Sequence, residues 1–318
     1  MKALRTVTLT AVAACIFTTA AWSETRVTYK SAKTGSSYYQ MAVQISEAMK
    51  AGSDGAIAVT VEESQGSVQN VMEVRARGGD YVFTTPPALV GLAQNGKAMF
   101  EGKSDPSFDT IQALFPIPSL TMHFVMSEAS GVTSFDQMEG KTVLLGSGSF
   151  GAREGAKYID LFGLTDKVTI ADSELSNAVS ALKNGQIDGF VTAGSYPAPN
   201  VIEAAASTGV TVLSLTPDQV AQSKRTELVI PTGTYAGQDQ DITTTSLPVV
   251  AYTTGKMDDE TAYQLTKTFW ETKAEMAGSA KWWDGVSTGM LANITTQIHP
   301  GAVRYYKEVG ATLSDAHM

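Results

Sequence analysis

Short strand-like runs alternate with helical patterns along most of this chain, and this alternation constrains its fold more than any other feature. A run at 26–29 is followed by a glycine-containing loop, and apolar residues then recur at helical spacing from 38 to 49. The same succession returns at 56–75 and at 141–162. Repeated β-loop-α units are typical of a mostly parallel sheet with helices on its faces, so we expect an α/β fold.

Two proline-containing extended segments divide this pattern into two units. Pro116 and Pro118 interrupt a long strand-like run at 111–126, and Pro248 opens a second extended run. Because proline suits a chain crossing better than a central strand, both segments predict crossings between two lobes with a ligand cleft between them. The expected bounds are 24–117 with 247–318 for the first lobe, and 118–246 for the second.

The N-terminus has the pattern of an export signal. Lys2 and Arg5 precede an apolar stretch at 7–21, and small residues follow it. This predicts a cleavable signal peptide over 1–23 and a periplasmic location. The alternative is a lipoprotein anchored through Cys15, but the apolar stretch continues past that cysteine.

Charge and composition exclude several classes of protein. The sequence holds 32 acidic against 23 basic residues, a formal net charge of −9, and no basic run, which argues against nucleic-acid binding. Cys15 is the one cysteine, so no disulfide is expected after export. His123, His299 and His317 lack metal-ligand spacing, so we expect neither a metal nor a cofactor.

The loop at 146–151 fits the pattern G-x-G-x-x-G between a strand and a helix. Three interpretations stay open: a nicotinamide-binding oxidoreductase with Asp172 as its ribose-binding acid, a glycine turn needed for packing alone, or a site for another small anion. Arg153 favours the anion, since a cation near a helix N-terminus opposes the helix dipole and a guanidinium suits a carboxylate. The candidate binding residues here are Ser147, Ser149, Phe150, Gly151 and Arg153.

Two other loops have similar chemistry. The segments at 34–37 and 64–67 each follow a strand and lead into a helix, with hydroxyls that either cap the helix or bind a ligand. A weaker case is the pair of threonines after the strand at 81–83. The candidate residues are Thr34, Gly35, Ser36, Ser37, Ser64, Gly66, Ser67, Thr84 and Thr85.

Five motifs occur in a fixed order along the chain. They are TGSSYY at 34–39, ESQGSVQN at 63–70, GVTSF with GKTV within 131–143, ALKNGQIDGF with GSYPAP within 181–199, and HPGAVRYY at 299–306. This ordered set resembles the solute-binding receptors of TRAP transporters, specifically the TAXI family.

The resemblance implies a two-lobed periplasmic binding protein of type II, not an enzyme. Such a receptor closes on a small solute, glutamate-like or a dicarboxylate, and hands it to membrane subunits driven by an ion gradient. The binding residues that the resemblance implies are Thr34, Gly35, Tyr38, Tyr39, Ser64, Gly66, Ser67, Asn70, Gly194 and Tyr196.

The sequence departs from the family where acidic residues are usual. It reads Thr84-Thr85-Pro86 where many members have Q-x-D, and Ala152-Arg153 where they have T-E. The loss of two acids and the gain of a guanidinium favour a dicarboxylate or 2-oxo acid over a glutamate-like ligand, and predict that Arg153 determines ligand charge most strongly. The alternatives are the oxidoreductase above and a ligand-sensing module for a membrane kinase.

Overall fold

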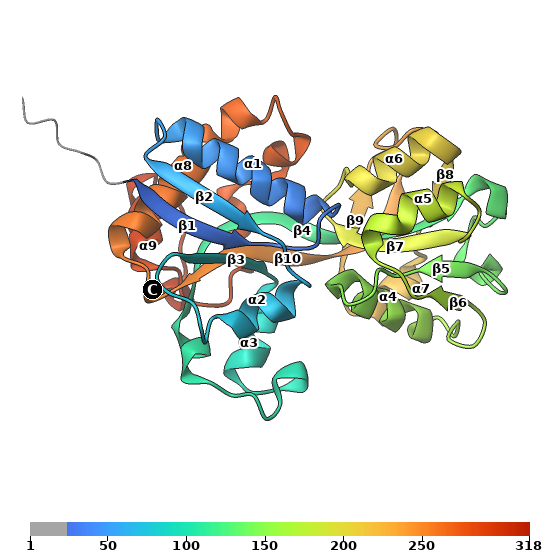
Figure 1. Cartoon of the computed structure of the whole chain (residues 1–318), viewed down its shortest axis with the longest axis horizontal. Coiled ribbons are helices and arrows are strands. Elements are labelled where there is room, and N and C mark those ends of the chain that lie inside the picture. The colour runs from blue at the N-terminus through green and yellow to red at the C-terminus, as the bar shows by residue number, and fades with distance from the viewer. Residues whose placement is uncertain (1–23) are drawn as a thin grey trace, which may run out of the picture.

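A computed structural model describes residues 24–318 except for the side chains of Phe150 and Lys281. The signal peptide expected over 1–23 lies outside the described residues. Within the described residues, ten strands form one curled mixed sheet with helices on its faces, arranged as two lobes (Figure 1). The α/β fold expected from the sequence is thus confirmed.

Each strand of the first lobe leads into a helix, as the repeating pattern predicts. The strands β1 and β2 are parallel, and so are β1 and β3, in the order β2-β1-β3. The bounds are β1 (Thr25–Lys30), α1 (Ser37–Gly52), β2 (Ile57–Glu62), α2 (Ser67–Glu73), β3 (Tyr81–Thr85) and α3 (Pro87–Gln94).

The second lobe repeats the arrangement with shorter strands. Its parallel core has the order β7-β5-β6, while β8 pairs antiparallel with β4 and β9 with β10. The bounds are β5 (Thr142–Leu144), α4 (Phe150–Leu161), β6 (Thr169–Ala171), α5 (Ala178–Lys183), β7 (Gly189–Gly194), α6 (Pro199–Thr208), β8 (Val210–Val212), α7 (Pro217–Ser223) and β9 (Thr226–Ile230).

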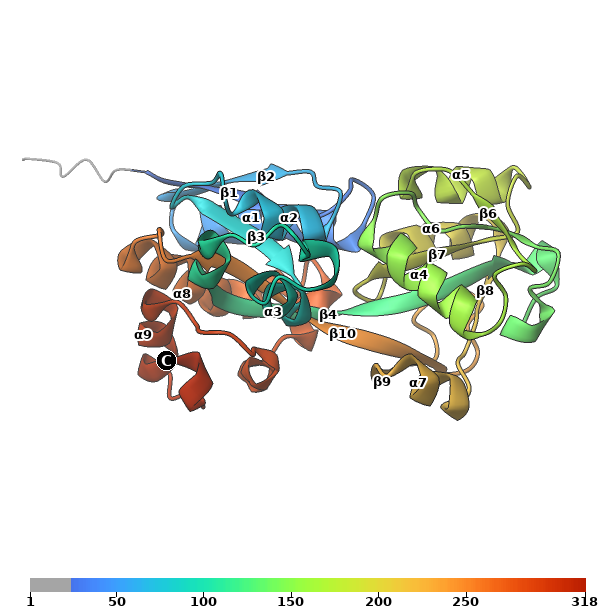
Figure 2. The same ribbon diagram turned by 90° about the horizontal axis from the view of Figure 1, so that it is seen from below.

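Two long antiparallel strands run through both lobes, β4 (Ile111–Ser127) and β10 (Ile242–Thr254) (Figure 2). These two strands are the crossings that the prolines predict. Both are nevertheless continuous and central in the sheet, a position in which proline is unusual because it has no N–H to donate. The structure accommodates Pro116 because β4 pairs there with β10 on one edge, while β7 joins the other edge only from Thr121 onward. The lobe bounds proposed from the sequence, at 117/118 and 246/247, fall inside these two strands.

The C-terminal helices α8 (Asp259–Met276) and α9 (Pro300–Glu308) cover the first lobe. The side chain of Asp258 caps α8 by accepting a hydrogen bond from the Thr261 N–H at 2.8 Å. Phe269 of α8 stacks on Phe115 of β4, with 4.0 Å between ring centroids. None of the described helices combines the length and apolar character that a membrane crossing requires.

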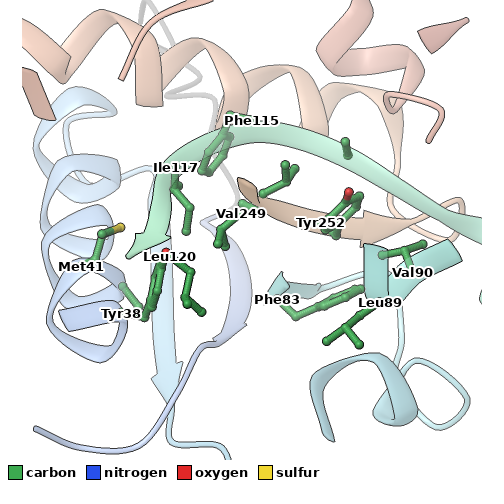
Figure 3. Close-up of a cluster of buried hydrophobic side chains, with 14 of the residues drawn as sticks. Tyr38, Met41, Phe83, Leu89, Val90, Phe115, Ile117, Leu120, Val249 and Tyr252 are labelled. Carbon is green, nitrogen blue, oxygen red and sulfur yellow. The ribbon is translucent and has the colours of Figure 1, made fainter. Parts of the chain in front are cut away.

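The core of the first lobe reaches the edge of the cleft. In Figure 3, Tyr38 and Met41 of α1 approach Leu120 of β4, while Val249 of β10 lies beside them. Tyr38 and Leu120 are buried in this cluster. Because Tyr38, Leu120 and Val249 also line the pocket between the lobes, packing in this core fixes the wall against which the loop side chains lie.

Candidate functional site

A pocket of about 50 Å³ lies where the two lobes meet. The first lobe contributes the ends of β1 and β3 and the starts of α1 and α2, and the second contributes the start of α4 and the end of β7. Since one water needs roughly 10–15 Å³, the space suits a small solute. The lining residues are Ser31, Ala32, Lys33, Ser36, Tyr38, Gln65, Gly66, Ser67, Thr84, Leu120, Ser149, Gly151, Leu175, Val191, Thr192, Ala193 and Val249.

The structure brings together part of the site predicted from the sequence. Seven of the predicted residues line the pocket: Ser36, Tyr38, Gly66, Ser67, Thr84, Ser149 and Gly151. Other predicted residues lie outside its lining: Thr34, Gly35, Ser37, Tyr39, Ser64, Asn70, Thr85, Ser147, Arg153, Gly194 and Tyr196.

Two of the lining hydroxyls cap helices that begin at the pocket. The Oγ of Ser36 accepts a hydrogen bond from the Tyr39 N–H at 3.3 Å, and that of Ser149 accepts one from the Ala152 N–H at 2.9 Å. The N-termini of α1 and α4 therefore border the pocket from opposite lobes. Their helix dipoles favour a negatively charged group between them.

Asn70 holds the lining in place from beneath. Its side chain is fully buried, and its Nδ2 donates to the carbonyls of Ser31 and Thr84, each at 2.8 Å. Its Oδ1 accepts from the hydroxyl of Ser64. One amide thus ties the ends of β1 and β3 to the loop before α2, which is a positioning role for two residues of the S-x-G-S-x-x-N motif.

Tyr38 contributes a neutral hydroxyl at the hinge side of the pocket. It donates to the Pro118 carbonyl at 2.8 Å, where β4 leaves the first lobe. Burial raises the pKa of Tyr38 well above its usual value, so the phenol stays protonated. It can therefore shape the pocket, but it supplies neither negative charge nor a second donor, because its one hydroxyl proton is donated to Pro118.

Among the lining residues that the sequence prediction missed, Lys33 is the charged one. It is the one charged side chain among the described lining residues, and it is 7% exposed. Its Nζ donates to the Ser147 carbonyl at 3.0 Å and forms an ion pair with Glu174, both in the second lobe. The signal available in the sequence was a lysine directly before the loop at 34–37.

The glycine loop at 146–151 is shaped by its backbone. Gly146 has a φ of +80°, and a Cβ there would come within 2.9 Å of the Leu175 side chain. Ser147 donates to Asp172 at 2.6 Å, so the acid expected to bind a ribose already has a partner within the lobe. These contacts favour the packing interpretation for Gly146 and give the dinucleotide interpretation no support.

Arg153 lies in the first turns of α4, half buried and beside Glu154. Burial lowers the pKa of its guanidinium from the usual value. Its side chain is outside the pocket lining, whereas Ser149 and Gly151 of the same segment belong to it. The lining cation is thus Lys33 rather than Arg153.

Several solved structures share the fold of this chain. The periplasmic binding protein BugD superposes with a TM-score of 0.56 at 13% identity, covering 91% of this chain and 98% of its own. MatC (Rpa3494) from Rhodopseudomonas palustris with bound malate gives 0.56 at 13% identity, covering 89% and 99%. A further periplasmic transporter structure gives 0.56 at 10% identity, covering 91% and 94%. The fold is therefore the two-lobed fold of periplasmic binding proteins.

A protein-family model also matches this chain. It matches residues 30–310, which take in both lobes and every lining residue of the pocket. The TAXI resemblance of the motifs stays a prediction beside this broader match. The chain belongs to the NMT1-like family.

Proposed function

We propose that this chain is the periplasmic solute-binding subunit of a transporter, which captures a small carboxylate between its lobes and delivers it to membrane subunits. The observation that carries the proposal is a small pocket lined from both lobes with a single buried cation, Lys33. The family match and the periplasmic binding protein fold support it.

The charge of the pocket supports an anionic solute. Lys33 and the N-termini of α1 and α4 all favour negative charge at the same place. No aspartate or glutamate side chain occurs among the described lining residues. Since an α-amino group needs an acidic or carbonyl partner, this lining favours a dicarboxylate or 2-oxo acid over a glutamate-like amino acid.

The size of the pocket disfavours the oxidoreductase alternative. Pockets for drug-sized ligands measure roughly 300–1,000 Å³, and a dinucleotide is larger still than many such ligands. The pocket here measures about 50 Å³. A TRAP transporter of the TAXI type remains our preferred assignment for the membrane partner, on the strength of the ordered motifs.

The lining suggests which side chains bind the solute. We assign direct contacts to Lys33 and to the hydroxyls at the starts of α2 and α4. Asn70 and Ser64 then act by holding these groups, and Gly194 acts by letting the lobes meet. These hydroxyls are those of Ser67 and Ser149. The hydroxyl of Ser36 donates instead to the Lys33 carbonyl at 2.7 Å, and that of Thr84 donates to the Tyr29 hydroxyl at 2.9 Å.

The test is native mass spectrometry of freshly purified protein followed by titration calorimetry with a defined panel. The panel is succinate, L-malate, 2-oxoglutarate, L-glutamate and the neutral analogue succinamide; malate is included because the MatC structure contains it. We expect a dicarboxylate or 2-oxo acid to bind, and succinamide not to bind. Selective binding of L-glutamate or succinamide would contradict the proposed solute class.

A further inference from the structure

We propose that Lys33 couples the charge of the solute to closure of the lobes: its ammonium binds Glu174 and Ser147 of the opposite lobe and at the same time contacts the negatively charged group of the solute. This proposal rests on the proposed function above and names the residue that links solute binding to closure of the lobes. It makes Lys33 a specificity-determining residue of the pocket.

The first ground is where Lys33 stands. It follows β1 directly and lines the pocket, yet both polar partners of its Nζ belong to the second lobe. Glu174 precedes the short helical turn before α5, and Ser147 lies in the loop before α4. Its Nζ therefore crosses the boundary between lobes at the mouth of the pocket.

The second ground is the number of donors. A lysine ammonium has three N–H groups, and the structure gives Lys33 two partners, the Ser147 carbonyl and the Glu174 carboxylate. One N–H is thus left for the pocket that this side chain lines. A carboxylate there would complete the coordination of the ammonium by charge-assisted hydrogen bonds.

The third ground is the contrast in burial between the two charged partners. The side chain of Lys33 is 7% exposed, whereas that of Glu174 is 53% exposed. A buried ammonium is costly without partners, while a half-exposed carboxylate is readily solvated when the pair separates. Closure of the lobes therefore stabilises the Lys33 ammonium more than the Glu174 carboxylate. A solute carboxylate in the pocket would stabilise the ammonium further.

Two further close approaches join loops of the first lobe to loops of the second near this ion pair. A Cβ on Gly35 would come within 3.8 Å of the Ser176 backbone, and one on Gly148 would come within 3.2 Å of the Gln65 side chain. The first approach joins the loop of Lys33 to that of Glu174, and the second joins the loop of Ser147 to the loop before α2. The ion pair is part of a continuous seam between the lobes rather than an isolated surface contact.

The solute-independent test is a distance measurement between spin labels on the two lobes. The labels are placed at Glu47→Cys on α1 and Glu203→Cys on α6, both exposed, in a Cys15→Ala background. Without added solute, we expect the unsubstituted protein to show a short-distance population that Lys33→Met and Glu174→Gln each reduce about threefold or more. The double variant should add little to either, because the two residues act as one unit.

A matched control separates this effect from a general loss of charge. Lys267→Met removes a lysine whose partner, Glu271, lies 4.0 Å away on the same helix, and it should leave the distances unchanged. Glu174→Gln keeps the size of a half-exposed side chain, so it tests the ion pair between the lobes in a protein that folds. Spin-label distances in Lys33→Met and Glu174→Gln that match those of the unsubstituted protein would overturn the proposed link between the Lys33–Glu174 ion pair and closure.

Binding of L-malate and 2-oxoglutarate tests the contact with the solute. We expect Lys33→Met to lower affinity by about 30-fold or more, and Glu174→Gln by less than about tenfold, because only the first removes a charge from the pocket itself. Equal losses in the two variants would overturn the solute contact. If neither probe binds the unsubstituted protein, the proposed solute class is wrong. The distance measurement alone then decides whether the Lys33–Glu174 ion pair holds the lobes together.

Discussion

The hydroxyl of Ser37 accepts a hydrogen bond of 2.9 Å from the backbone N–H of Ser195, which joins the first turn of α1 in one lobe to the end of β7 in the other. The neighbouring Gly194 lies so close to this hydroxyl that a Cβ would overlap the Ser37 Oγ. The two lobes can therefore meet here only because position 194 has no side chain.

Replacing that glycine should prevent full closure. We expect Gly194→Ala to lower solute affinity by about tenfold or more, equivalent to about 1.4 kcal/mol, while the lobes themselves stay folded. Ser37→Ala in the same chain should restore part of the affinity, because it removes the overlapping oxygen. Calorimetry measures both effects, and Gly91→Ala, in α3 with open space around the added methyl, is the control. Unchanged affinity in Gly194→Ala would show that this seam is not part of the bound state.

Solute binding should make the protein more compact. The pocket is lined from both lobes, and β4 and β10 are the strands that connect them, so a solute that contacts both sides favours the closed arrangement. Small-angle scattering at saturating solute should give a smaller radius of gyration than the protein alone. An identical radius in the two samples would contradict closure.

Arg153 and Lys33 are rival candidates for the cation that binds the negatively charged solute. The sequence ranks Arg153 first, whereas the structure places Lys33 in the pocket lining and Arg153 outside it. We expect Arg153→Ala to change affinity by less than about threefold, as for a residue beside the site. A loss of several hundredfold with an unchanged melting temperature would restore Arg153 as the principal cation.

Stability should fall as the pH drops below 6.5, because of a buried histidine. Burial lowers the pKa of His123 to about 4. The ring Nε2 accepts a hydrogen bond from the Tyr235 hydroxyl at 2.8 Å, and Nδ1 lies 3.2 Å from the Thr121 carbonyl. This arrangement fits a neutral imidazole. The unfolded chain therefore binds the proton first, and a contribution on the order of 2–4 kcal/mol, complete above pH 6.5, is lost between pH 6.5 and 4.

Urea unfolding as a function of pH measures this contribution. His123→Gln should remove most of the slope of unfolding free energy between pH 6.5 and 4.5. Some slope should remain, because burial also lowers the pKa of His299. Below pH 4.5 carboxylates held at lowered pKa, such as Glu62 beside Arg77, add to the loss. A slope unchanged by His123→Gln would place the titrating group elsewhere.

Removal of metal ions should leave solute binding intact. Among residues 24–318, no group of three or more histidine, cysteine or acidic side chains is arranged to hold a metal. Affinity measured after dialysis against a strong chelator should equal that before dialysis. A large loss that one specific metal reverses would contradict this expectation.

The repeating pattern of strands and helices was enough to predict the fold. Apolar periodicity places α1 and its buried face correctly, since Met41, Ile45 and Met49 all enter the core. It could not predict that β10 inserts between β3 and β4, because strand order depends on pairings between residues more than a hundred positions apart.

The site was harder to predict for a physical reason. Loop hydroxyls such as Ser36 and Ser149 could be recognised because they follow strands and begin helices. The importance of Lys33 depends on Glu174 and Ser147, which are brought to it only when the lobes meet. Arg153 lies outside the lining because its distance from a helix start does not determine which side of the helix it occupies, and its role in binding stays a prediction.

The position of β10 also determines when the chain can fold. It is the last strand in the sequence, yet it fills the space between β3 and β4 and pairs with β9 as well. Until residue 254 is available, at about four fifths of the chain, both lobes lack a strand and expose unpaired backbone edges. Such a chain cannot reach its native state early in synthesis, and both lobes can complete their pairing only after β10 has been made.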